Sequence, residues 1–206
     1  MNELQPLAVK PKQGGYTLVE LAIAVAILAV LIVAGLTGVQ GILTSGKVND
    51  QIKTVAKLGS KISANFGSLS TSGITLSTVA NLGGWDTSKI SVSGTTTTVR
   101  SAFNGGEFII SNTAAISGIA ANSGVIYTIA SVPREACPDL ANGIGALAYG
   151  IAVKTATAVS AEAWPTAETP TTKFLKTPGT SNIDPATLAS GCAINANGDF
   201  IIAIKP

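Results

Sequence analysis

The sequence predicts an α+β fold in which one long N-terminal helix packs on an antiparallel β-sheet. Three observations predict it. Residues 21–46 contain no ionisable side chain, apolar residues then recur at helical spacing as far as Phe66, and later apolar segments alternate with Gly and Asn turns. The chain of 206 residues is long enough for one anchor helix and one domain of ordinary size.

The first part of the helix has the length of a membrane span. Residues 21–39 are almost entirely apolar, and at about 1.5 Å per residue they extend roughly 28 Å, close to the hydrocarbon thickness of about 30 Å. Lys10 and Lys12 precede this run. Because basic residues stay on the cytoplasmic side, we expect the remainder of the chain to lie outside the membrane.

Glu20 lies at the start of this apolar segment, where an unpaired charge is costly. The nearest cations along the chain are Lys12 and Lys47. Cleavage between Gly15 and Tyr16 would create an α-amino group that is largely protonated at neutral pH. Since that amine and Glu20 of the same chain lie more than a helical turn apart, we expect them to pair between neighbouring subunits.

Residues 12–21, KQGGYTLVEL, resemble the processing site of type IV prepilins. In that family basic residues and a Gly precede an apolar residue, a T-L-x-E-L motif and a long apolar helix. The resemblance implies that Gly14 and Gly15 end a leader and that Tyr16 is the N-methylated first residue of the mature chain. Glu20 would then be the fifth mature residue, and Tyr16 and Glu20 together would guide assembly.

The resemblance also implies the division of the chain. We expect a removed leader at 1–15, a spine helix at 16–66 with its membrane span at about 21–43, and a globular head at 67–206. Two simpler alternatives explain less. A secretory signal peptide has a shorter apolar region that precedes its cleavage site. A plain signal anchor explains the span but gives no reason for Glu20.

The second part of the helix has an amphipathic pattern. Apolar positions are spaced three or four apart, and most charged residues fall between them, which predicts one buried face: Val48, Ile52, Val55, Leu58 or Gly59, Ile62 and Phe66. Four glycines interrupt the helix before this face: Gly35, Gly38, Gly41 and Gly46. They indicate either close helix packing in the membrane or a stretch that unwinds on assembly.

The remaining elements are short. We expect strands at 90–93, 95–100, 107–111, 125–132, 148–154 and 200–204, and short helices at 76–82, 133–143 and 185–190. We expect residues 155–184, with three prolines, to be a surface excursion with little regular structure. The glycines of the Gly143-Ile144-Gly145 segment are interpreted as turns.

Cys137 and Cys192 are the two cysteines, and an even pair in an exported domain predicts a disulfide. Closing a loop of about 55 residues contributes roughly 4 kcal/mol in the chain-entropy model. A zinc site is disfavoured because the chain has no His. The layout resembles type IVb pilins, in which a strand leads into a short Cys-bearing helix and a second Cys precedes the final strand. The resemblance implies a disulfide-bounded region at 137–192.

Enzyme chemistry is not indicated. The absence of His excludes Ser-His-Asp and Cys-His arrangements, and the sequence has neither a P-loop nor a dinucleotide-binding fingerprint. A net charge of +2 without a basic cluster does not favour nucleic acid. We therefore expect no catalytic residues, no metal and no cofactor.

The resemblance implies a major pilin of a type IVb pilus that serves adhesion, aggregation or conjugation. Its partners would be other copies of itself, prepilin peptidase, the inner-membrane assembly machinery and, before assembly, the membrane. The subunit would move from the bacterial inner membrane to an extracellular filament. The alternatives are a minor pilin or pseudopilin of a secretion, DNA-uptake or conjugation machine and, from another class, a membrane-anchored enzyme or receptor.

Overall fold

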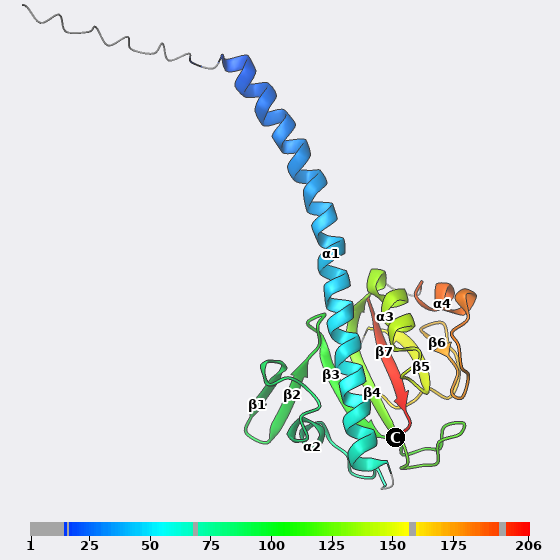
Figure 1. Cartoon of the computed structure of the whole chain (residues 1–206). Helices are drawn as coiled ribbons and strands as arrows, with labels where there is room; N and C mark the ends of the chain where they lie inside the picture. Colours follow the sequence, from blue (N-terminus) through cyan, green and yellow to red (C-terminus); the bar gives the residue numbers. More distant parts are fainter. Residues whose placement is uncertain (1–14, 16, 68–69, 157–159, 194–196) are drawn as a thin grey trace, which may run out of the picture. The chain divides into compact units, whose positions relative to one another are not determined.

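The computed structural model describes residues 15, 17–67, 70–156, 160–193 and 197–206. The chain divides into two compact units, Met1–Ile42 and Leu43–Pro206. The helices are α1 (Leu18–Phe66), α2 (Leu76–Asn81), α3 (Cys137–Ile144) and α4 (Pro185–Gly191), with short 3₁₀ helices η1 (Thr87–Lys89) and η2 (Arg134–Ala136) (Figure 1). The strands are β1 (Ile90–Ser93), β2 (Thr96–Arg100), β3 (Gly106–Ser111), β4 (Val125–Pro133), β5 (Gly150–Thr155), β6 (Thr172–Lys176) and β7 (Asn197–Ile204).

The seven strands form one antiparallel sheet in the order β1-β2-β3-β4-β7-β5-β6. The C-terminal strand β7 therefore lies in the middle, between β4 and β5. Tyr127 of β4 is opposite Ile109 on one side and Ile202 on the other. The predicted α+β class and the antiparallel sheet are confirmed.

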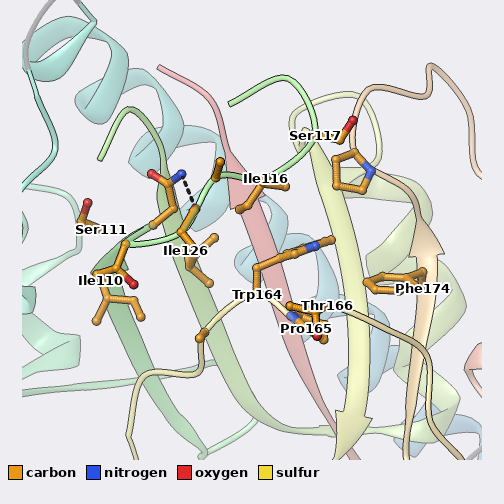
Figure 2. A pocket seen from close by; sticks show the side chains of 15 residues that line it. Ile110, Ser111, Ile116, Ser117, Ile126, Trp164, Pro165, Thr166 and Phe174 are labelled. Atoms are coloured by element: carbon orange, nitrogen blue, oxygen red, sulfur yellow. Dashed lines mark hydrogen bonds between the residues drawn. The ribbon is translucent and has the colours of Figure 1, made fainter. Parts of the chain in front are cut away.

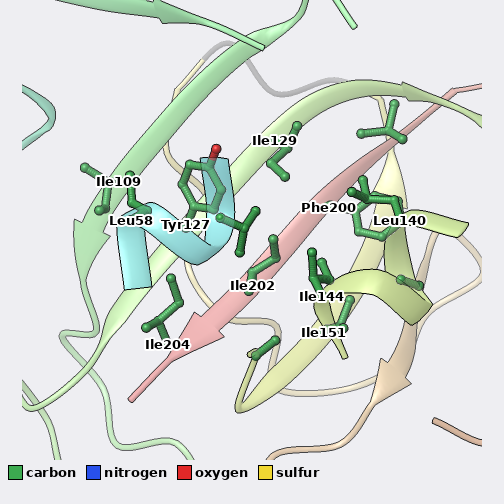
Figure 3. Packing of buried hydrophobic residues seen from close by; sticks show 14 of the residues in the cluster. Leu58, Ile109, Tyr127, Ile129, Leu140, Ile144, Ile151, Phe200, Ile202 and Ile204 are labelled. Atoms are coloured by element: carbon green, nitrogen blue, oxygen red, sulfur yellow. The ribbon is translucent and has the colours of Figure 1, made fainter. Parts of the chain in front are cut away.

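The main core lies between the sheet and the part of α1 that belongs to the second unit. Alternate residues of the central strands face this core, as expected for the two-residue period of a strand. Figure 3 shows Leu58 of α1 over Ile109 and Tyr127, and Leu140 and Ile144 of α3 over Phe200 and Ile151. The predicted buried face of α1 is confirmed: Val48, Val55, Leu58 and Ile62 are buried, and Ile52 and Phe66 are partly buried.

A second, smaller apolar cluster covers the opposite face of the sheet. It is built on Ile126, Ala152, Ile201 and Ala203, which are the outward-facing residues of the central strands. Two loop segments cover it and supply Ile116, Ile119 and Trp164. Because both faces of β4 and β7 are covered, these strands have almost continuous buried sequences.

Gly143 was predicted as the end of a short helix and, together with Gly145, interpreted as a turn; the turn interpretation of Gly143 is wrong. It lies in α3, which continues to Ile144. A Cβ at this position would lie 2.1 Å from Cδ1 of Ile52, so Gly143 is the residue that lets α3 approach α1 closely. Tertiary packing therefore outweighs the low helix propensity of glycine here.

The C-terminal half contains more strand than the sequence predicted. Residues 155–184 were expected to be irregular, yet β6 forms within them and pairs with β5. Leu175 of β6 faces the main core, whereas Phe174 faces the outer cluster, and this alternation stabilises the strand. β7 also begins at Asn197, three residues before the expected strand at 200–204, because Gly198 and Asp199 pair with β5. Most other boundaries differ from the prediction by one or two residues.

Candidate assembly site

The N-terminus of α1 is capped by three reciprocal hydrogen bonds between Thr17 and Glu20. The backbone N–H and Oγ1 of Thr17 donate to Oε2 of Glu20, both at 3.0 Å, and the N–H of Glu20 donates to Oγ1 of Thr17 at 3.3 Å. This is a capping box, which satisfies backbone donors that the first helical turn leaves free. The T-x-x-E spacing could have indicated it, although the sequence prediction considered only cationic partners for Glu20.

The capping box leaves one carboxylate oxygen of Glu20 available. Within the described residues Oε1 of Glu20 has no hydrogen-bond partner, and the residue is exposed. Gly15 is described and exposed, whereas Gly14 and Tyr16 lie outside the described residues. The predicted processing site and the proposed pairing of Tyr16 with Glu20 therefore stay predictions.

The apolar stretch that follows Glu20 has no burial partner in the chain. An 18-residue window of α1 has a mean hydropathy of 2.8 and is not buried, and the helix is long and apolar enough to cross a membrane. Its large apolar side chains are between half and three-quarters exposed, for example Leu28 at 56% and Ile42 at 73%. A Cβ added at Gly35, Gly38 or Gly41 would meet no atom within 4 Å. These glycines do not pack against any other segment within the described part of the chain. Their lack of a side chain would allow a second helix to approach α1 closely.

A buried polar cluster fixes the other part of α1 to the sheet. Gln51 of α1 donates from Nε2 to Oε1 of Glu107 at 2.9 Å and to the hydroxyl of Tyr127 at 3.1 Å. The Oε1 of Gln51 accepts from the backbone N–H of Ala102 at 3.0 Å. The indole N–H of Trp85 and the hydroxyl of Tyr127 both donate to Oε2 of Glu107. Because every member is hydrogen-bonded, the cluster defines one register of the helix on the sheet.

Burial determines the protonation behaviour of this cluster. Removal from water raises the pKa of the Glu107 carboxyl above its usual value, while hydrogen bonds from Tyr127, Gln51 and Trp85 oppose the rise. Burial and the neighbouring Glu107 raise the pKa of the Tyr127 phenol well above its usual value, so this hydroxyl remains a donor. None of these four residues was identified from the sequence, because they come together only through tertiary structure.

Two ion pairs join the same part of α1 to the segment around η1. Lys57 binds Asp86 at 2.7 Å, and Lys89 binds Asp50 at 2.7 Å. The Lys57 ammonium holds the pKa of Asp86 below its usual value. Because at least one partner of each ion pair is exposed, we expect the two ion pairs to contribute less to the stability of the head than the buried cluster does.

The disulfide expected between Cys137 and Cys192 is present, with a Cα–Cα distance of 5.7 Å. It joins the first residue of α3 to the C-cap of α4. Buried Lys176 of β6 reinforces this region, because its ammonium donates to the carbonyls of Gly145 at 2.6 Å and Ala148 at 2.8 Å. A cation beside these carbonyls at the end of α3 is electrostatically favourable. Among the described residues, no group of His, Cys, Asp and Glu is arranged to hold a metal ion.

Comparison with known proteins gives one match at the N-terminus. Residues 10–36 match the sequence family described as the prokaryotic N-terminal methylation motif. This segment includes Gly15, Tyr16 and Glu20 together with most of the apolar run. No curated protein matches over the chain.

Two solved structures resemble the chain beyond that segment. The type IVb pilin from Salmonella typhi is 13% identical, with a TM-score of 0.55 over 77% of this chain and 99% of that one. TcpA, a type IV pilin from the Vibrio cholerae El Tor biotype, is 15% identical, with a TM-score of 0.56 over 77% of this chain and 98% of that one. The chain has the type IVb pilin fold and carries the prepilin methylation motif.

Proposed function

We propose that this chain is the major subunit of a type IVb pilus. It is cut after Gly15 by prepilin peptidase, held in the bacterial inner membrane by residues 21–43, and polymerised into an extracellular filament by the inner-membrane assembly machinery. The N-methylation motif and the pilin fold support this proposal. Both are features expected of a structural subunit that assembles with copies of itself.

The single observation that carries the proposal is the exposure of the first part of α1. A helix of this length and hydropathy cannot remain in water, because each fully exposed Leu or Ile forgoes about 1.5–3 kcal/mol of burial. It is covered by lipid before assembly and by the equivalent helices of neighbouring subunits afterwards. The open space around Gly35, Gly38 and Gly41 supports close contact between such helices.

Glu20 gives this association its axial register. One of its oxygens caps its own helix through Thr17, and the other has no partner within the described residues. The free oxygen accepts from the Tyr16 amine of a neighbouring subunit. An apolar helix surface alone permits many axial positions, whereas a charge pair in a low-dielectric filament core favours one.

The Glu20→Ala substitution tests the proposal. We expect cells that carry the cognate assembly machinery to process this variant normally but to release far fewer filaments on shearing, because the register contact is lost. Western blots of the membrane and sheared fractions measure both quantities. Glu135→Ala, which removes an exposed acid of the head, is the control and should leave the filament yield unchanged. A normal yield from Glu20→Ala would contradict the proposed role of Glu20.

Deletion of the gene distinguishes a major subunit from a minor one. Complete loss of filaments, together with this chain as the dominant band of sheared material, agrees with the proposal. Filaments that persist in the deletion strain, together with only traces of this chain in material sheared from wild-type cells, would instead assign it to the minor pilins or pseudopilins.

A further inference from the structure

A cavity of about 340 Å³ lies on the face of the sheet opposite α3. Figure 2 shows it between Ile110 and Ile126 of the sheet, the segment that carries Ile116 and Ser117, and the segment that carries Trp164 and Thr166. Its volume falls within the range of about 300–1,000 Å³ that is typical of small-molecule sites. Nothing in the proposed assembly mechanism uses this cavity.

The loop on one side of the cavity is held rigidly. Asn112 is buried, and its side-chain amide donates to the carbonyls of Ala114 at 3.2 Å and Ala120 at 2.9 Å, while its Oδ1 accepts from the N–H of Gly124 at 2.7 Å. Ile116 and Ile119 exchange two backbone hydrogen bonds further along the loop. The cavity wall is therefore organised before any ligand binds, which lowers the entropic cost of binding.

Trp164 forms a flat aromatic surface across the middle of the cavity (Figure 2). Phe174 stacks against its ring at a centroid distance of 5.7 Å. Gly150 lies beneath its edge, since a Cβ there would be 2.8 Å from Cη2 of the indole. The ring is half-buried and supported by its neighbours, yet it still lines the cavity.

The lining is uncharged and mainly apolar, and Thr113, Ser117 and Thr166 add hydroxyl groups to it. None of the described residues that line the cavity has a charged side chain. Within the described part of the chain, the hydroxyls of Thr113, Ser117 and Thr166 and the indole N–H of Trp164 make no hydrogen bonds. Thr113, Ser117 and Thr166 are exposed and Trp164 is partly exposed, so these groups are accessible to a ligand.

We propose that this cavity binds one or two rings of a neutral saccharide. The C–H face of a pyranose ring carries partial positive charge and stacks on the electron-rich face of Trp164. Sugar hydroxyls both donate and accept, so they match the free hydroxyls of Ser117 and Thr166. An apolar side chain from another protein would bury the same groups without partners, which is unfavourable. The lack of charge excludes a specific site for an acidic sugar.

Saturation-transfer NMR on the full chain tests the proposal. The protein is solubilised in a detergent without a sugar headgroup and mixed at millimolar concentration with galactose, N-acetylgalactosamine, lactose, N-acetyllactosamine or cellobiose. We expect at least one of these probes to bind, and Trp164→Ala to weaken it at least about tenfold. Because the assay uses unassembled subunits, its failure is independent of the proposed filament function.

Matched variants keep the test informative if Trp164→Ala does not fold. Thr166→Val and Ser117→Ala remove cavity hydroxyls and should weaken binding, whereas Thr98→Val removes an exposed hydroxyl of β2 outside the cavity and should not. The proposal is overturned if no probe binds, or if the cavity variants bind as well as wild type. Sedimentation of the same samples gives a further contradicting result: reduced self-association in the cavity variants, without any saccharide effect, would identify a contact between copies.

Discussion

The two parts of the continuous helix α1 differ in what surrounds their apolar side chains. Up to Ile42 the helix belongs to the first unit and its apolar side chains are exposed. From Leu43 to Phe66 it belongs to the second unit, where one face is buried in the main core and Gln51 enters a buried polar cluster. The second part packs against the head, whereas the first part is not covered by any described residue and, on the proposed function, is covered by lipid or by neighbouring subunits.

This difference predicts that the two parts respond differently to mutation. The second part contributes to the free energy of unfolding of the head, because its side chains have defined partners. On the proposed function, we expect the first part to contribute to membrane insertion and to subunit association, because its apolar side chains have no such partners within the described residues. A substitution in one part should therefore leave the property of the other largely unchanged.

The largest effect should come from Glu107→Ala. This change leaves the indole N–H of Trp85, the hydroxyl of Tyr127 and the amide of Gln51 buried without an acceptor, so we expect a loss of about 3–5 kcal/mol in the free energy of unfolding. Denaturant unfolding followed by tryptophan fluorescence measures it. A loss below about 1 kcal/mol would show that the cluster does not hold α1 to the sheet.

A matched pair of leucines gives the sharpest contrast. Leu58 is fully buried and Leu28 is 56% exposed, on the same helix. Leu58→Ala should reduce the free energy of unfolding of the head by about 2–5 kcal/mol because it leaves a cavity, whereas Leu28→Ala should leave it within about 0.5 kcal/mol of wild type. Denaturant unfolding of both variants in the same detergent makes the comparison. Equal losses in the two variants would contradict the division of α1 into two parts.

The smallest effect concerns pH. Because burial raises the pKa of Glu107 in the folded chain above its unfolded value of about 4.3, the folded state binds the proton more tightly. The contribution of Glu107 to the free energy of unfolding is therefore fully present below the pKa that Glu107 has in the unfolded chain. It is lost as the pH rises through the higher pKa of the folded chain. As the pH falls from 7 toward 4.5, wild type should therefore gain stability relative to Glu107→Gln. A constant difference between the two unfolding curves would contradict this assignment.

The sequence predicted those features that depend on local pattern. The buried face of α1 follows from helical spacing, and the disulfide between Cys137 and Cys192 from the even cysteine count in an exported domain. The α+β class also follows from such patterns, whereas the type IVb pilin fold was predicted from a resemblance that rests mainly on a short N-terminal motif and on the layout of the cysteines. The capping box of Thr17 and Glu20 was also readable from spacing, although it was not predicted.

The remaining features depend on contacts between distant segments. Glu107 has no sequence neighbour that indicates a buried carboxylate, and its three partners lie 20 to 56 residues away. The sequence around Gly143 does not reveal that Ile52 of α1 packs against it, so nothing in the local pattern indicates why a glycine lies in α3. Trp164 lies in a proline-containing segment that was expected to be irregular. The cavity that it lines forms only where this segment packs on the sheet, which the sequence alone does not show.

The N-terminus of the protein in cells tests the central claim most directly. Mass spectrometry of material sheared from the cell surface should find a chain that begins at Tyr16, carries one additional methyl group and lacks residues 1–15. That result would connect the methylation motif to a processed subunit whose exposed helix is free to assemble. Surface material that begins at Met1, or a chain that stays entirely in the membrane fraction, would contradict the account.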